Sequence, residues 1–251
     1  MCERCVGAAR HAPIARRGFL KLAATMAAGL AIARPALAAN AGGPPKPENT
    51  LSPDAALDRL MQGNARYVDG RSRRHDLLSR RHDFKHEREA LSQGQNPFAA
   101  VLSCADSRIA PEYCFDTARG DVFVCRVAGN FASDDIVASF EHAVQVLNTP
   151  LILVLGHESC GAVGATIKSI KDGTTLPGHL PALVTALAPA VNAGQGAPGD
   201  LLANATRRNV MLNVERLKTA APILKSFVDD KKVRVAGGIY ELKSGRINLL
   251  S

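Results

Sequence analysis

Apolar residues along this chain fall into short uninterrupted runs, separated by segments whose apolar positions have helical spacing. Three such runs have strand length, at 98–102, 122–126 and 151–155, and 231–236 is a further predicted strand. Because these runs lack the polar alternation of a half-exposed strand, they indicate parallel strands covered on both faces. Ligands of such sheets bind at the carboxyl ends of the strands.

Helical segments lie between the predicted strands. Ser52-Pro53-Asp54 supplies a capping residue and a first-turn proline, and apolar residues then recur at helical spacing. Further helices are expected over 136–147, 160–170 and 200–218. The pattern predicts an α/β fold, with a central mostly parallel β-sheet flanked by helices, an N-terminal helical arm and a C-terminal antiparallel hairpin of 239–242 with 246–250. We expect the proline-rich segment 173–199 to be a surface excursion.

Length and composition divide the chain into one core with extensions. The 251 residues, 46% of them hydrophobic, suffice for one domain with a single core. We expect an export signal over 1–38, a linker rich in proline and glycine over 39–50, an N-terminal helical arm over 51–94 and a metal-binding α/β catalytic core over 95–251.

The net charge of +8 does not indicate a nucleic-acid-binding protein. Six of the 31 basic residues and one of the 23 acidic residues fall within 1–38, so the remainder carries only +3. No basic stripe studded with aromatic residues accompanies this small excess. We therefore expect no nucleic-acid partner.

The basic excess instead belongs to a segment that resembles a twin-arginine leader. Arg16-Arg17 precedes an Ala- and Leu-rich stretch over 22–32, and Ala36-Leu37-Ala38 is typical of a cleavage site. The stretch is too short and too weakly apolar for a stable membrane span. A periplasmic location is therefore expected, with a retained anchor as the alternative.

Two short motifs follow predicted strands and carry the chemistry. They are 103–108 (SCADSR) and, about fifty residues later, 156–161 (GHESCG). If the two strands are parallel neighbours, Cys104, His157 and Cys160 meet at one point and suit a soft or borderline ion such as zinc. Three protein ligands leave the fourth position to water, as in catalytic zinc sites.

Two other interpretations of these motifs involve no metal. Cys104 could be a nucleophile with His157 as its base, or the nucleophile of a phosphatase-like loop in which an arginine binds phosphate. Neither requires a second thiol at Cys160. Of the other cysteines, Cys2 and Cys5 lie in the leader without a role, and Cys114 and Cys125 are expected to be buried free thiols, with a disulfide as the alternative.

The residues around the metal motif suit attack by a hydroxide on a small electrophilic carbon. Zinc lowers the pKa of water, so that a hydroxide nucleophile exists near neutral pH. Asp106 follows the first ligand by two residues and can accept a hydrogen bond from that hydroxide. Arg108 can hold the carboxylate through a fork-shaped ion pair. A structural salt bridge in the turn is the alternative interpretation of this pair.

The two motifs together resemble the β-class carbonic anhydrase family. The resemblance extends over most of the chain after about residue 50, through the ordered segments 63–67, 111–112, 120–124, 126, 128–130, 139–141, 161–163 and 237–240. It implies a zinc cofactor and an enzyme that is a homodimer or tetramer. It also implies that Asp106 can swing onto the metal as a fourth ligand in a closed state.

The resemblance assigns further residues to substrate binding. Gln95 matches a glutamine that binds substrate across the dimer interface, Phe123 matches an apolar pocket wall, and Gly161 provides a backbone amide close to the metal. The predicted function is zinc-dependent reversible hydration of carbon dioxide to bicarbonate and a proton. Hydrolysis of carbonyl sulfide or carbon disulfide is the alternative reaction. A catalytically silent zinc-stabilised binding protein is the alternative of another class, which the intact Asp106 and Arg108 disfavour.

Overall fold

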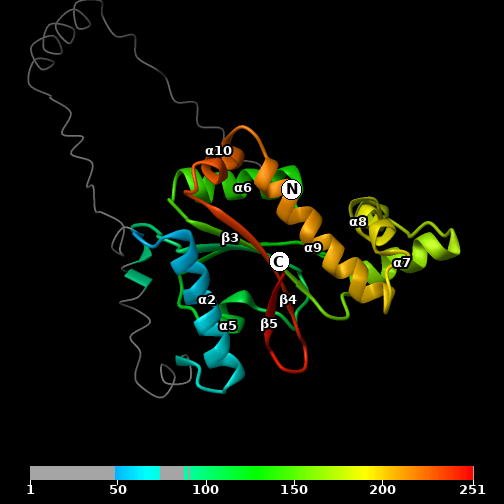
Figure 1. The fold of residues 1–251 in the computed structure, drawn as a ribbon, viewed down its shortest axis with the longest axis horizontal. Helices are drawn as coiled ribbons and strands as arrows, with labels where there is room; N and C mark the ends of the chain where they lie inside the picture. Colours follow the sequence, from blue (N-terminus) through cyan, green and yellow to red (C-terminus); the bar gives the residue numbers. More distant parts are fainter. Residues whose placement is uncertain (1–48, 74–87, 90, 251) are drawn as a thin grey trace, which may run out of the picture. The chain divides into compact units, whose positions relative to one another are not determined.

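The computed structural model describes residues 49–73, 88, 89 and 91–250, which all belong to the compact unit Gly43–Ser251. The centre of this unit is a five-stranded sheet with the order β2-β1-β3-β4-β5 (Figure 1). The first four strands are parallel and β5 runs antiparallel to β4. Their bounds are β1 Ala99–Ser103, β2 Val122–Arg126, β3 Leu151–His157, β4 Arg234–Tyr240 and β5 Ile247–Leu250. This arrangement confirms the predicted mostly parallel α/β sheet.

Helices cover both faces of the sheet. Within the described part of the chain they include α2 Pro53–Val68, α5 Pro111–Cys114, α6 Asp134–Gln145, α7 Gly161–Asp172, α8 Leu180–Gly194, α9 Leu201–Thr219 and α10 Ile223–Asp229. No helix in this part of the chain has an apolar stretch long enough to cross a bilayer. The predicted leader at 1–38 and nearly all of the linker lie outside the described residues.

The two faces of the sheet bury alternate residues of the same strands. On β1, Ala99 and Val101 pack with α2 and α5, whereas Ala100 and Leu102 pack with α6, α9 and α10. The whole of β1 and β3 is buried, which is why these strands read as unbroken apolar runs. A third, smaller cluster under α7, α8 and α9 surrounds the carboxyl ends of β1 and β3.

The predicted cap of the first helix is confirmed, and a second helix has a cap that was not predicted. Ser52 caps α2 and accepts a hydrogen bond from the amide of Ala55 at 3.2 Å. Asp200 caps α9 in the same way, through the amide of Ala203 at 2.8 Å. Each cap satisfies one amide that has no partner within its helix. Cys114 and Cys125 are buried free thiols, as expected.

Two expectations about the carboxyl-terminal half are wrong. The segment 173–199 contains α8, whose Leu187, Ala190 and Val191 are buried, so it is not only a surface excursion. Of its prolines, Pro181 lies in the first turn of α8, where a helix tolerates proline, and Pro189 lies inside the helix at an exposed position. The other wrong expectation is the break before residue 239, because β4 runs on through Gly237 and Gly238. The predicted antiparallel hairpin itself is confirmed, since Ile239 and Tyr240 at the end of β4 pair with β5.

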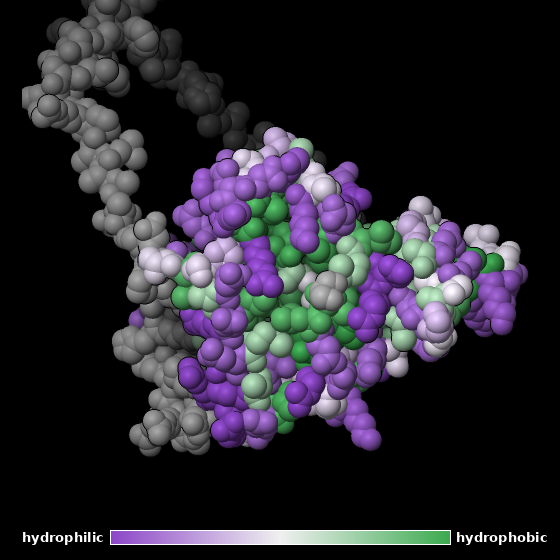
Figure 2. Space-filling model, viewed as in Figure 1, coloured by the Kyte–Doolittle hydropathy of each residue, from purple (hydrophilic) through white to green (hydrophobic). Residues whose placement is uncertain are grey.

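Apolar side chains also reach the surface. Figure 2 shows them gathered in the middle of the face that carries β4 and β5, surrounded by hydrophilic residues. Leu249 on β5 is 42% exposed. Its neighbour Leu250 borders a hollow of about 540 Å³ whose lining includes Val214 of α9, Val228 of α10 and Val235 of β4, together with charged residues. Such a patch is typical of a surface that contacts another protein.

Candidate metal centre

The metal centre lies where two neighbouring parallel strands end. β1 ends at Ser103, so Cys104 is the first residue beyond it, and β1 pairs directly with β3. The sequence suggested that His157 lies in the turn after β3, but it is the last residue of that strand. Cys160 follows as the capping residue of α7. The two motifs therefore meet at one edge of the sheet, as predicted.

The three predicted ligands form one buried group. Their ligand atoms all lie within 4.8 Å of one another, and the side chains are at most 4% exposed. The Nδ1 atom of His157 lies 2.8 Å from the carbonyl oxygen of Glu158. Because a carbonyl only accepts, Nδ1 carries the hydrogen and Nε2 keeps its lone pair. This Nε2 is buried without a hydrogen-bond partner among the described residues.

These features fit a zinc ion. Two sulfurs and one imidazole nitrogen are the donors that zinc prefers, and bonds of roughly 2.0–2.3 Å can span a group of this size. A buried nitrogen without a partner is costly unless something binds it. Cys104, His157 and Cys160 are therefore the residues that would hold the ion.

The surroundings of the two thiols favour a thiolate at Cys104. Hydrogen bonds from the Cys160 thiol and the amide of Gly129 lower the pKa of Cys104 to about 4, although burial opposes this. The shared hydrogen bond with Cys104, together with burial, raises the pKa of Cys160 above its usual value. Thiolates are the form of cysteine that binds metals.

Asp106 and Arg108 form the predicted fork-shaped ion pair beside the ligands. Arg108 donates from Nε to Oδ1 at 2.9 Å and from Nη2 to Oδ2 at 2.7 Å. Its hydrogen bonds hold the pKa of the Asp106 carboxyl well below its usual value. Oδ2 of Asp106 lies 4.0 Å from Nε2 of His157, which places the carboxylate next to the position of the metal.

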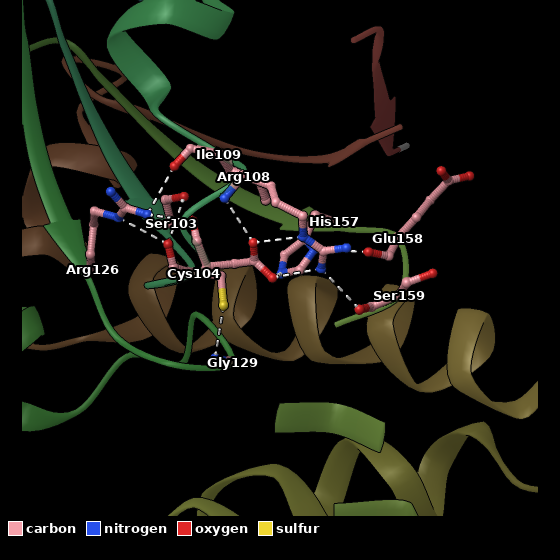
Figure 3. Close-up of polar contacts among 10 residues, drawn as sticks. Ser103, Cys104, Arg108, Ile109, Arg126, Gly129, His157, Glu158 and Ser159 are labelled. Atoms are coloured by element: carbon pink, nitrogen blue, oxygen red, sulfur yellow. Dashed lines mark hydrogen bonds and ion pairs between the residues drawn. The ribbon is translucent and has the colours of Figure 1, made fainter. Parts of the chain in front are cut away.

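Arg126 holds the turn that carries Cys104. Its guanidinium donates to three backbone carbonyl groups, of Cys104 at 2.9 Å, Asp106 at 2.8 Å and Ile109 at 2.8 Å (Figure 3). The sequence prediction assigned no role to this residue. The feature of the sequence that could have indicated this role is the single charge of Arg126 at the carboxyl end of β2, an otherwise apolar strand.

Gly129 and Asn209 complete the surroundings of Cys104. The amide of Gly129 donates to the Cys104 sulfur at 3.3 Å, and the Gly129 carbonyl accepts from Asn209 of α9 at 2.7 Å. Gly129 has φ +86°, and a Cβ there would lie 2.7 Å from Leu187. Glycine is therefore required for this amide to reach the sulfur.

The structure separates Gln95 and Phe123 from the ligands. Gln95 is exposed and precedes β1, and Phe123 pairs with Ala100 near the start of that strand. Five residues of β1 advance about 17 Å before Cys104 is reached. These two residues are therefore not brought to the metal of their own chain. Gly161 is adjacent to Cys160, with open space beside its Cα.

Comparison with known proteins agrees with this geometry. The family model for carbonic anhydrase matches residues 99–247. Carbonic anhydrase 2 of Mycobacterium tuberculosis is 38% identical over 195 residues, which cover 78% of this chain and 91% of that protein.

Solved structures show the same architecture. The β-carbonic anhydrase CcaA is 26% identical with a TM-score of 0.58, over 78% of this chain and 95% of its own. A structure described among two tetrameric β-carbonic anhydrases of Sordaria macrospora is 22% identical with a TM-score of 0.61, over 75% and 98%. The sequence matches, the fold and the cysteine-histidine-cysteine group lead to one conclusion: the chain belongs to the β-class carbonic anhydrase family.

Proposed function

We propose that this protein is a zinc enzyme that catalyses the reversible hydration of carbon dioxide to bicarbonate and a proton. The observation that carries the proposal is the buried group of Cys104, His157 and Cys160 beside the Asp106–Arg108 pair. When bound, zinc supplies a hydroxide nucleophile near neutral pH by lowering the pKa of water.

Asp106 and Arg108 orient the reaction. The Oδ2 atom of Asp106 lies 4.0 Å from Nε2 of His157, so with zinc held by the three ligands this carboxylate would accept the hydrogen of the hydroxide and orient its lone pair toward carbon dioxide. Arg108 holds the carboxylate in one orientation with two parallel hydrogen bonds. In this arrangement both carboxylate oxygens bind Arg108. Movement of Asp106 onto the metal in a closed state stays a prediction.

The test is a stopped-flow hydration assay on protein of measured zinc content, with carbon dioxide and carbonyl sulfide compared. We expect rapid hydration of carbon dioxide. The Asp106→Ala variant should be slower at equal zinc content, while Asp134→Ala, which loses an exposed ion pair with Arg216, should match the wild type. Turnover of carbonyl sulfide alone would favour the hydrolase alternative, and turnover of neither substrate would indicate a binding protein.

We also propose that the active site is completed by a second copy of the chain. The support is the placement of Gln95 and Phe123 at the amino end of β1, opposite the metal ligands, so that in an assembly they can serve the metal of a neighbouring chain. The apolar side chains gathered on the face that carries β4 and β5 offer additional contact area (Figure 2). The related structure from S. macrospora is described as tetrameric.

Mixed subunits test this proposal. Cys104→Ser removes a ligand and Gln95→Ala removes the substrate contact, so each variant alone should lose most of its activity. If Gln95 acts in the neighbouring site, statistical mixing restores up to about one quarter of wild-type activity, since half of the dimers contain one complete site. If the mixture has only the summed activity of its two component variants, Gln95 acts within its own chain.

The predicted leader gives a proposal about location. We propose that residues 1–38 direct folded, zinc-loaded protein to the periplasm, on the strength of Arg16-Arg17 and the cleavage-site pattern of Ala36-Leu37-Ala38. Replacing both arginines with lysine should retain the full-length protein in the cytoplasmic fraction. Unchanged release of the protein by osmotic shock would contradict the proposal.

A further inference from the structure

The metal ligand His157 depends on its neighbour Glu158 for the orientation of its ring. The Glu158 carbonyl oxygen accepts the hydrogen of Nδ1 at 2.8 Å, and this bond directs the lone pair of Nε2 toward the two cysteines. A hydrogen bond to the second ring nitrogen commonly fixes the tautomer and the orientation of a metal-binding histidine. The position of the Glu158 peptide therefore sets the geometry of one ligand.

Glu158 itself is attached at two points to the last residue of β4 and the segment that follows it. The amide of Glu158 donates to the carbonyl of Tyr240 at 3.1 Å, and the side-chain Oε2 accepts from the amide of Leu242 at 3.1 Å. Figure 3 shows the carboxylate of Glu158 turned away from Cys104. The side chain therefore does not act on the metal directly.

The turn that Glu158 begins is under backbone strain. Ser159 has φ +52°, a conformation that costs free energy in a residue other than glycine. Such a conformation persists only when surrounding contacts hold it. Arg108 contributes a long contact, from Nη2 to the Ser159 carbonyl at 3.4 Å, and the Glu158 carboxylate holds the other end of the turn.

We propose that Glu158 is a positioning residue for the metal site. Its carboxylate anchors the turn between His157 and Cys160 to the backbone of Leu242 and so keeps the Glu158 carbonyl aligned with Nδ1 of His157. The segment after β4 thereby becomes part of the support of the metal centre. The inference rests on the proposed zinc site but not on turnover of carbon dioxide.

Three substitutions separate this role from charge and from general stability. Glu158→Gln keeps an oxygen acceptor for Leu242, Glu158→Asp keeps the charge but shortens the reach, and Glu158→Ala removes both. Glu241→Ala is the matched control, because Glu241 lies in the same segment and its carboxylate accepts hydrogen bonds from the side chains of Ser244 and Asn248, away from the His157 turn.

The experiment measures zinc release from the full-length zinc-loaded protein to a chelator, together with the ¹⁵N chemical shifts of the His157 ring. We expect about tenfold faster release and altered shifts for Glu158→Ala and Glu158→Asp, with wild-type behaviour for Glu158→Gln and Glu241→Ala. Circular dichroism checks that each variant is folded.

Two outcomes would overturn the inference: wild-type release and shifts in Glu158→Ala, or equal acceleration in Glu241→Ala. Should Glu158→Ala not fold, Glu158→Asp against Glu158→Gln decides the question. Neither readout uses carbon dioxide, so a zinc protein that fails to hydrate it would refute the proposed function and leave this inference intact. A wild-type protein that binds no zinc would refute both.

Discussion

At the scale of single residues, the shape of the Arg108 guanidinium matters as much as its charge. Two parallel hydrogen bonds fix both oxygens of Asp106, and a lysine ammonium cannot reproduce this fork. We expect Arg108→Lys to lower kcat by about 10–100-fold at unchanged zinc content, measured by stopped-flow hydration. Arg216→Lys, at an exposed ion pair, is the control. A kcat within twofold of the wild type would contradict this.

The metal-binding residues were predictable from the sequence, whereas the residues that hold these ligands in position were not. Cys104, His157 and Cys160 follow apolar runs of strand length, so their convergence followed from the parallel sheet. Arg126 and Glu158 act through backbone carbonyl and amide groups, which every residue has, and only coordinates show which of them meet. The family resemblance implied that Gln95 acts across a dimer interface, and its place before β1, away from its own metal ligands, agrees with that expectation.

At the scale of elements, α9 supports the loop that carries Gly129. Asn209 and Asn213 are both buried and hydrogen-bonded to each other, and they bind the Gly129 carbonyl and the Ala132 amide. We expect Asn209→Ala to lower the free energy of unfolding by about 1–3 kcal/mol, because the Gly129 carbonyl would remain buried without its partner.

Urea unfolding measures this effect. Asn204→Ala is the matched control, since Asn204 lies on the same helix and binds only carbonyl groups of the exposed loop before it. Equal losses of stability in both variants would show that the contact with Gly129 has no special importance. The Asn209 variant should also bind zinc more weakly than the control, because Gly129 contacts Cys104 directly.

The element boundaries that the sequence misplaced share one physical cause. Glycine and proline indicate breaks when only local preference is considered. In β4, Gly237 is required because a Cβ there would lie 2.7 Å from Val210 of α9, so close packing explains the residue and no turn occurs. In α8, burial of Leu187 and Val191 against the third apolar cluster outweighs the cost of an internal proline.

At the scale of the whole molecule, a partly buried ion pair between Arg66 and Asp116 ties α2 to the segment after α5. Burial would raise the pKa of Asp116, but hydrogen bonds from Ser72 and Arg66 outweigh it, so the pKa lies below its usual value. A carboxyl whose pKa is lower in the folded state contributes stability that is complete above its unfolded pKa of about 3.9 and is lost as the pH falls through the folded pKa.

Asp116→Asn should therefore be less stable than the wild type at pH 7. The difference in free energy of unfolding should shrink as the pH falls below about 4. Urea midpoints of the metal-free proteins across this range provide the measurement. Asp54→Asn, which removes an exposed pair with Arg234, is the control and should change little. A difference that is constant with pH would contradict the role of the Asp116 charge.

The ligands come from chain segments about fifty residues apart, and this has a thermodynamic consequence. An ion that joins them acts as a reversible cross-link of the folded state alone, so zinc affinity and resistance to heat are linked by mass action. Free zinc at about 100 times its Kd should add roughly 2.7 kcal/mol and raise the melting temperature by about 5–10 °C. A melting temperature that does not change with free zinc would show that zinc does not stabilise the junction between the ends of β1 and β3.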